Sequence, residues 1–229
     1  MTGTPGTSPE ESRPEEKLAM TSYTPPVGQE QPRRSRPLWL RSLITTACIV
    51  AALFVIELID AATRYDLDQN GIEPRQVDGL DGILWAPMLH ADWEHLLANL
   101  MPGAVLCFLV LMTRRFLVVT GIIWVISGVG VWLFAAPYSV TVGASGIIFG
   151  WLTFLIVRGL FNRDLWQILG GVVLFLIYGS ILWGVLPTNP IVSWQAHLFG
   201  AIAGVLAAWF LASRDRKQKQ PTATPGVAS

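Results

Sequence analysis

Charged side chains are scarce in this sequence of 229 residues. They make up 14% of the chain, against about 25% in an ordinary soluble domain. Sixteen Lys and Arg balance sixteen Asp and Glu, so the net charge is zero, while 52% of the residues are hydrophobic. A neutral, charge-poor surface on so apolar a chain would precipitate from water. The composition therefore argues against a soluble globular enzyme, and the lack of net positive charge argues against a nucleic-acid binder.

Cysteine and histidine are also rare, with two and three residues respectively. Cys48 and Cys107 both lie in apolar runs, which suggests buried thiols rather than a disulfide framework or a metal site. Tryptophan and glycine are plentiful, with ten and 21 residues. Membrane proteins use these residues for interfacial belts and close helix packing. The composition thus indicates a membrane protein.

Long stretches of the sequence contain no Asp, Glu, Lys or Arg. They cover residues 42–56, 95–113, 116–157 and 165–213. A membrane helix needs about 20 residues, and the two longest stretches are each divided by a Pro-containing segment, at 135–139 and 186–190. The pattern predicts an all-α, polytopic membrane protein. Its six helices are expected at about 38–60, 93–113, 116–135, 143–158, 165–186 and 193–213.

The two ends of the chain have a different composition. Residues 1–36 are rich in Pro, Thr, Ser and Glu and are predicted to form a disordered tail, as are the basic residues 214–229. With six crossings, both ends and 14 of the 16 basic residues share one side of the membrane, while the loop after the first helix is acidic. The positive-inside rule places that basic side in the cytoplasm of a cell membrane.

A few polar residues interrupt the apolar helices, and such residues are functional candidates by default. They are His95 and Asn99 in the second helix, Ser145 in the fourth and His197 in the sixth, with His90 just before the second. Counted from the next basic residue at about 1.5 Å per residue, His95, Ser145 and His197 lie at similar depths in the outer half of the membrane. Asn99 lies one turn below His95 on the same face.

Each of these residues also has a simpler interpretation. Ser145 in the run Gly143-Ala144-Ser145-Gly146 is compatible with a small-residue packing patch, and the glycines of Gly200-Ala201-Ile202-Ala203-Gly204 with a helix-packing face. A lone histidine or asparagine can simply bond a neighbouring helix. The shared depth on three helices favours a common site. Two His and one Asn, without a carboxylate or thiol at that depth, make a poor metal site.

Three motifs, together with the six crossings, resemble the rhomboid intramembrane serine proteases, specifically the bacterial six-helix type. They are residues 90–99 (HADWEHLLAN), 143–146 (GASG) and 197–204 (HLFGAIAG). The resemblance implies a rhomboid-like bundle over roughly residues 38–213 that works without a metal or cofactor. It implies Ser145 as nucleophile and His197 as general base, with Phe149 packed against the histidine.

Further roles follow from the same resemblance. His95, the Asn99 amide and the Ser145 backbone N–H would stabilise the oxyanion, and His90 would brace the first outer loop. Gly143, Gly146, Gly200 and Gly204 would support close packing around the site. The substrates would be membrane proteins with a transmembrane segment, cleaved near the outer leaflet in a water-filled cavity ringed by residues 137–143 and 187–194.

One feature departs from the family pattern. Many members carry a Trp-Arg pair in the first outer loop, where this chain has Asp81-Gly82, with Trp85 displaced towards the helix. Two other functions remain open: a catalytically inactive rhomboid-like protein that binds membrane clients, and, less favoured, a small transporter. A transporter would need polar residues in the inner half as well, and the helices are apolar there.

Overall fold

The computed structural model describes residues 2–3, 36–64, 66–188 and 192–219. Six helices among these residues are long and apolar enough to cross a membrane. They are α1 (Leu38–Ala62), α3 (Trp93–Met112), α4 (Phe116–Phe134), α5 (Ser145–Asn162), α6 (Leu165–Tyr178) with its 3₁₀ continuation η3 (Gly179–Val185), and α7 (Trp194–Lys219). The chain is therefore an all-α, multi-pass membrane protein, as the charge-free stretches predict.

Three crossings differ from the sequence-based expectation in how they end. The fourth, α5, continues to Asn162 rather than ending near 158. The fifth crossing changes from α-helix to the tighter 3₁₀ form at Gly179 and ends before Pro187, which cannot continue a helix. The last helix continues to Lys219 rather than ending near 213, because no Gly or Pro interrupts residues 205–219. The predicted tails otherwise fall on residues outside the described ranges, apart from residues 2–3 and 36.

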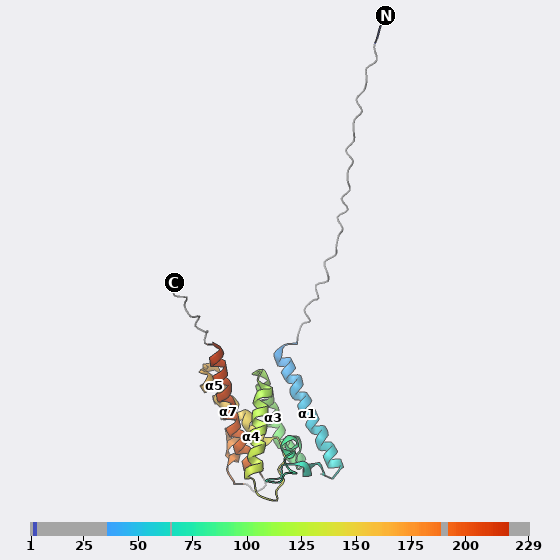
Figure 1. The fold of residues 1–229 in the computed structure, drawn as a ribbon, viewed down its shortest axis with the longest axis vertical. Helices are drawn as coiled ribbons and strands as arrows, with labels where there is room; N and C mark the ends of the chain where they lie inside the picture. The colour runs from blue at the N-terminus through green and yellow to red at the C-terminus, as the bar shows by residue number, and fades with distance from the viewer. Residues whose placement is uncertain (1, 4–35, 65, 189–191, 220–229) are drawn as a thin grey trace. The chain divides into compact units, whose positions relative to one another are not determined.

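Helices α5 and α7 lie side by side (Figure 1) and make the most extensive contact between two helices of the described residues. Glycines bring their backbones together: a Cβ on Gly200 would clash with the carbonyl oxygen of Gly146, and one on Gly204 with that of Gly150. The Thr153 hydroxyl also donates a hydrogen bond of 2.9 Å to the Ala201 carbonyl. In the most apolar part of α5, 61% of residues are buried, against 6% in α6–η3. Helices α5 and α7 are thus packed tightly against each other, whereas α6–η3 lies at the periphery of the bundle.

The loop between α1 and α3 is folded rather than extended. It contains η1 (Leu67–Asn70), the short helix α2 (Gly82–Trp85) and η2 (Ala86–Met88). Paired backbone hydrogen bonds of 2.9 and 3.0 Å join Ile72 to Thr141 in the segment that precedes α5. The loop is therefore tied to the entrance of α5.

Gly82, at one of the two positions where many family members carry a Trp-Arg pair, lies at a close backbone contact within the loop. A Cβ on Gly82 would clash with the Gly71 backbone, so two parts of the loop meet there without side chains. The anchoring tryptophans come from α4 instead: Trp124 donates to the Ile83 carbonyl at 2.6 Å and Trp132 to the Gln76 carbonyl at 2.9 Å. The loop is thus held from α4 by indole N–H groups.

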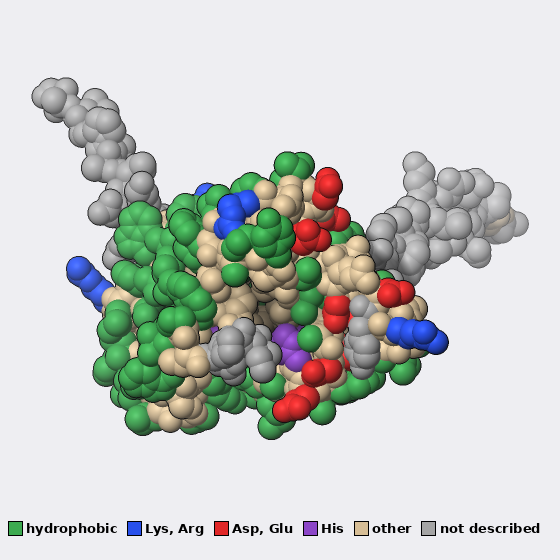
Figure 2. All heavy atoms as spheres, turned by 90° about the horizontal axis from the view of Figure 1, so that it is seen from below, with side chains coloured by type: hydrophobic (Ala, Val, Ile, Leu, Met, Phe, Trp, Pro, Cys, Tyr) green, Lys and Arg blue, Asp and Glu red, His purple; other side chains and the backbone are tan. Residues whose placement is uncertain are grey.

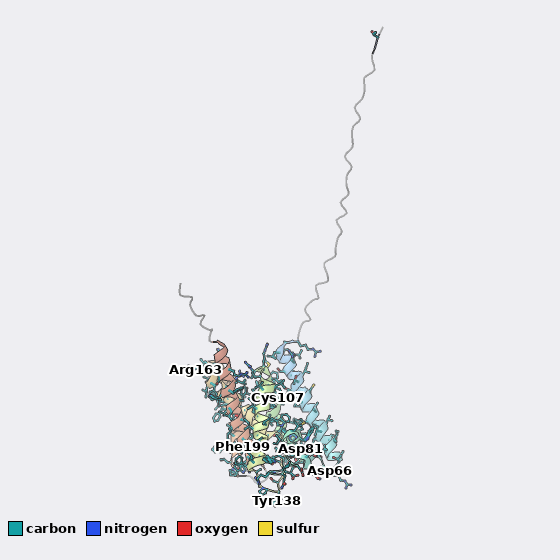
Figure 3. The ribbon with its side chains drawn as sticks, viewed as in Figure 1. Asp66, Asp81, Cys107, Tyr138, Arg163 and Phe199 are labelled. Carbon is teal, nitrogen blue, oxygen red and sulfur yellow. The ribbon has the colours of Figure 1, made fainter. Side chains whose placement is uncertain are left out.

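The two ends of the bundle carry different charges. The described end of α7 and the start of α1 lie at the same end of the bundle (Figure 1). Figure 3 shows Arg163 near that end and Asp66, Asp81 and Tyr138 towards the other. The acidic first loop and the basic ends are therefore on opposite sides, as predicted.

The two cysteines differ in burial. Cys107 is buried and accepts a hydrogen bond from the Thr46 hydroxyl at 3.7 Å, whereas Cys48 is exposed on the outer face of α1. The expectation that both thiols are buried is wrong for Cys48. Helix α1 packs mainly on α3, so an apolar residue on its other face meets the surroundings of the bundle rather than its core.

Candidate active site

Ser145 and His197 form a hydrogen-bonded pair although 52 positions separate them in the chain. The Ser145 Oγ and the His197 Nε2 lie 2.9 Å apart. Ser145 is the first residue of α5, and His197 lies in the first turn of α7. The close packing of these two helices through Gly146 and Gly200 brings the side chains together.

A backbone carbonyl determines the tautomer of His197. The Nδ1 of the ring lies 2.9 Å from the carbonyl oxygen of Gly184 in η3. A carbonyl can only accept a hydrogen bond, so Nδ1 carries the proton in the neutral ring. The Nε2 atom is then free to accept the hydrogen of the Ser145 hydroxyl, which is the form a general base needs.

An aromatic ring holds the imidazole from one face. The rings of Phe149 and His197 stack with centroids 3.9 Å apart and an interplanar angle of 7°. Phe149 lies one turn below Ser145 on α5, so both side chains point towards α7. Together with the Gly184 carbonyl, this stacking fixes the orientation of the ring.

His95 reaches the same site from α3. Its ring packs against Gly143, where a Cβ would lie 2.8 Å from Nε2. Gly143 has a φ of +115°, a conformation that L side chains rarely adopt, and its N–H donates to the Ala86 carbonyl at 2.8 Å. Glycine is thus required here both by backbone conformation and by the proximity of His95.

Asn99 lies one turn below His95 and is 8% exposed. Its amide nitrogen donates a hydrogen bond of 2.8 Å to the His95 carbonyl. A primary amide has two N–H groups, and Asn99 lines the same cavity as Ser145. One donor can therefore hold the side chain in place while the other serves the cavity.

The start of α5 supplies further donors. The backbone N–H groups at the first positions of a helix have no carbonyl partner within it, and this end carries a partial positive charge. Because Ser145 is the first residue of α5, its own N–H belongs to this set. The hydroxyl and a backbone donor are thus provided by one residue.

These residues line a cavity of about 890 Å³ at the loop end of the bundle. Figure 2 views this end and shows a histidine at the bottom of a hollow. The walls include residues 139–142 before α5, Pro187 and residues 192–193 before α7, and residues 194–195 at the start of α7. The cavity lies between the two segments that the sequence predicts around it, although residues 189–191 of the second are outside the described ranges.

His90 lies behind His95 rather than in the cavity. It is 1% exposed, and its ring contacts the His95 ring edge-on with centroids 5.2 Å apart. Burial, with a smaller contribution from His95, lowers the pKa of His90 to about 4. The ring is therefore neutral near pH 7 and acts as packing for the α3 end of the site.

Sequence reasoning missed two groups that shape the site. Gly184 contributes only its carbonyl, and its surroundings in the sequence match no motif. The hydroxyl of Ser127 on α4 donates to the Ala196 carbonyl at 3.0 Å and would clash with a Cβ on Gly146. Its only signal is a hydroxyl within an apolar helix.

The geometry defines a class: a multi-pass membrane protein with a serine–histidine pair in a cavity among its helices. Residues 80–214 match the Rhomboid domain, and the chain belongs to the rhomboid family. It is 46% identical over 194 residues to an uncharacterized protein of Mycobacterium tuberculosis, covering 80% of this chain and 81% of that one. An uncharacterized protein of Mycobacterium leprae is 45% identical, covering 83% and 78%.

A more distant relative has a name that indicates activity. The Rhomboid-like protease 5 of Toxoplasma gondii is 31% identical over 148 residues, which cover 61% of this chain and 17% of that protein. This relationship supports the family.

Proposed function

We propose that the protein is an intramembrane serine endopeptidase that cleaves transmembrane segments of other membrane proteins. The observation that carries this proposal is the 2.9 Å contact between the Ser145 hydroxyl and the His197 Nε2, with Nδ1 held by the Gly184 carbonyl. A serine hydroxyl becomes a competent nucleophile when an adjacent base accepts its proton. Family membership supports the same reaction.

The first half of the reaction forms an acyl-enzyme. The Ser145 Oγ attacks the carbonyl carbon of the scissile peptide bond, and its proton moves to Nε2 of His197. The imidazolium that results keeps its Nδ1–H on the Gly184 carbonyl and stacks on Phe149. His197 then gives the proton to the departing amine nitrogen, and the C–N bond breaks.

The tetrahedral intermediate needs hydrogen-bond donors for its negative oxygen. The Ser145 N–H, the second N–H of the Asn99 amide and the His95 ring take this role. His95 and Asn99 are on α3 and His197 is on α7, so the proposed oxyanion donors and the general base come from different helices. Removing one such donor commonly lowers kcat by about 10²–10³.

The second half needs water in the cavity. A water molecule gives its proton to Nε2 of His197 and attacks the acyl carbon, after which Ser145 recovers its proton and the acid product leaves. The cavity opens at the loop end, so the substrate must present an extended segment there. Helix-breaking residues near that end of the substrate helix would expose its peptide bonds.

The charge asymmetry supports an orientation. With 14 of 16 basic residues on the side of the termini, the positive-inside rule places both termini in the cytoplasm of a cell membrane and the cavity near its outer leaflet. Cysteine labelling from outside would test this: a Cys introduced at exposed Asp78 is expected to react with an impermeant reagent, whereas one at Arg163 is not.

An inactive rhomboid-like protein that binds membrane clients is the main alternative. It would have no need for a general base with its tautomer fixed by a backbone carbonyl. The two functions differ in a single experiment with purified protein and a single-span reporter substrate. Cleavage by the wild type that is abolished in Ser145→Ala and His197→Ala supports the protease.

A fluorophosphonate probe gives a second, substrate-free measurement. Such probes react with an activated serine, so labelling is expected in the wild type and is lost in Ser145→Ala. Ser139→Ala is a matched control, because Ser139 lines the same cavity and, among the residues that the structure describes, its hydroxyl donates to the Ala136 carbonyl alone. If the wild type is folded yet neither cleaves nor labels, the client-binding function is the better account.

A further inference from the structure

The mouth of the catalytic cavity carries charge of one sign. Asp92 and Glu94 line the cavity, and no Lys or Arg is among the described residues that line it. Figure 2 shows acidic side chains beside the hollow that contains the histidine, with basic side chains further from it. The charged groups that a substrate meets on entering are therefore carboxylates.

The two carboxylates differ in what they do for the fold. Asp92 is the N-cap of α3, and its Oδ1 accepts a hydrogen bond of 2.7 Å from the His95 N–H. Glu94 is exposed and makes no side-chain hydrogen bond or ion pair with another described residue. Glu94 is thus available to a partner, one residue away from His95 in the sequence.

The surrounding loop strengthens the negative potential. The described residues of the segment between α1 and Asp92 include five acidic residues and two arginines, Arg64 and Arg75. Arg75 is bound to the carbonyls of Leu133 and Ala135 through Nη1. Neither arginine lines the cavity. The acidic side chains therefore set a negative electrostatic potential at its mouth.

We propose that Glu94, with Asp92 beside it, selects substrates that carry a lysine or arginine in the segment adjoining the scissile bond on the loop side of the membrane. This proposal rests on the proposed protease function and adds a substrate class to it. The hydrocarbon-embedded part of a substrate has no charges to select, so selection by charge must act on the adjoining extramembrane residues. Glu94 lies where such residues would enter the cavity.

The expected size of the effect on kcat/KM follows from the exposure of the Glu94 side chain. A single exposed ion pair changes binding by up to about fivefold, and a cavity wall that excludes part of the water increases this. We therefore expect about a three- to tenfold difference in kcat/KM between substrates that differ by one charge. The difference should decrease at high salt, since exposed charges are screened.

The test uses one reporter substrate in three versions, with Lys, Gln or Glu at the same position just outside its transmembrane segment. For the wild type we expect cleavage in the order Lys, Gln, Glu. In Glu94→Gln the ratio of kcat/KM for the Lys and Glu versions falls towards one, and in Glu94→Lys the order reverses. Asp92 is left unchanged because losing its cap would disturb α3.

Asp78→Asn is the matched control. Asp78 is an exposed acid of the loop between α1 and α3 and does not line the cavity, so Asp78→Asn removes the same charge as Glu94→Gln without changing the cavity wall. For this variant, the ratio of kcat/KM for the Lys and Glu substrates should equal that of the wild type. The proposal is overturned if the wild type cleaves all three substrates equally, or if Asp78→Asn reduces the ratio as much as Glu94→Gln.

Binding to Ser145→Ala protein separates this proposal from the protease function. The three substrates are titrated onto the variant in detergent micelles, and their Kd values are compared without any cleavage. A lower Kd for the Lys version that disappears when Glu94→Gln is added supports charge selection even if no substrate is ever cleaved. Equal Kd values together with equal cleavage rates refute it while leaving the protease function intact.

Discussion

The carbonyl oxygen of Gly184 lies 2.9 Å from the Nδ1 of His197. In many serine hydrolases a carboxylate holds this position, but here it is a backbone group of η3, the segment that continues the most exposed of the six crossings. The orientation of the general base therefore depends on where η3 lies. A displacement of α6–η3 would move the acceptor of Nδ1–H, so the peripheral helix and the central dyad are physically coupled.

Gly184→Ala tests this coupling. A Cβ at Gly184 would lie 2.9 Å from both Nδ1 of His197 and Cζ of Phe149, so η3 or the ring must shift. We expect kcat/KM for a reporter substrate to fall about 10²-fold, the usual cost of misplacing a catalytic group by about 1 Å. Gly170→Ala on α6 is the control, because a Cβ there meets nothing within 4 Å. Equal rates in the two variants would contradict the positioning role.

Asn99→Ala tests the proposed oxyanion donor. We expect kcat to decrease about 10²–10³-fold with a much smaller change in KM, because the donor acts on the intermediate rather than on the bound substrate. Leu97→Ala on the same helix is the control, since Leu97 is 52% exposed and away from the site. A change confined to KM would place Asn99 in substrate binding instead.

Gly200→Ala tests the central helix contact. The added methyl would clash with the carbonyl of Gly146, so α7 must move away from α5, and with it His197 from Ser145. Overpacking of this kind costs about 1–3 kcal/mol. Both the melting temperature in detergent and the fluorophosphonate labelling rate should fall. Gly121→Ala on α4, where a Cβ meets nothing within 4 Å, should change neither.

Most of the fold follows from where charges are absent. The charge-free stretches predict all six crossings, because a bilayer rejects charged side chains wherever they occur. The depths of Ser145, His95 and His197 follow from the same spacing, and the structure places all three around one cavity. Stacking of Phe149 on His197 was expected from the resemblance and is present in the structure.

Other features could not be predicted, because they depend on backbone atoms or tertiary packing. The Gly184 carbonyl is a group that every residue possesses, so no side-chain pattern indicates it. The anchoring of the first loop by Trp124 and Trp132 depends on how α4 faces that loop. The change to 3₁₀ geometry at Gly179 reflects hydrogen-bond register, to which hydropathy is insensitive.

The lowered pKa of His90 predicts that the protein loses stability in acid. Its pKa in the folded protein is about 4 because of burial, with a smaller contribution from His95, against about 6.5 in an unfolded chain. Between these values the unfolded state binds a proton that the folded state does not, so the free energy of unfolding falls as the pH is lowered from 6.5 to 4. Relative to His90→Gln, the wild type should lose stability across this range when melting is followed in detergent. A constant difference between the two proteins would show that His90 is not buried in its neutral form.

The raised pKa of Asp68 predicts the opposite trend, a loss of stability as the pH rises. Burial is the main cause that raises its pKa to about 7, followed by the charge of Asp60 and a side-chain hydrogen bond with that residue, with smaller contributions from Glu57 and Asp92. Between about pH 4 and 7 the folded state therefore holds a proton that the unfolded state has lost, so stability falls as the pH rises through this range.

Asp68→Asn keeps a hydrogen-bond donor towards Asp60 at every pH. The Asp60 carboxylate accepts a 2.8 Å hydrogen bond from the Leu67 N–H through Oδ1, while its Oδ2 and the Asp68 Oδ1 are buried without another partner. An amide hydrogen at position 68 can satisfy Oδ2 where two carboxylates would repel each other. We expect the variant to melt above the wild type at pH 8 and close to it at pH 5. Gln69→Asn, at the exposed neighbouring position, should follow the wild type at both pH values. A variant that melts below the wild type at pH 8 would show that repulsion between the Asp60 and Asp68 carboxylates does not destabilise the folded protein.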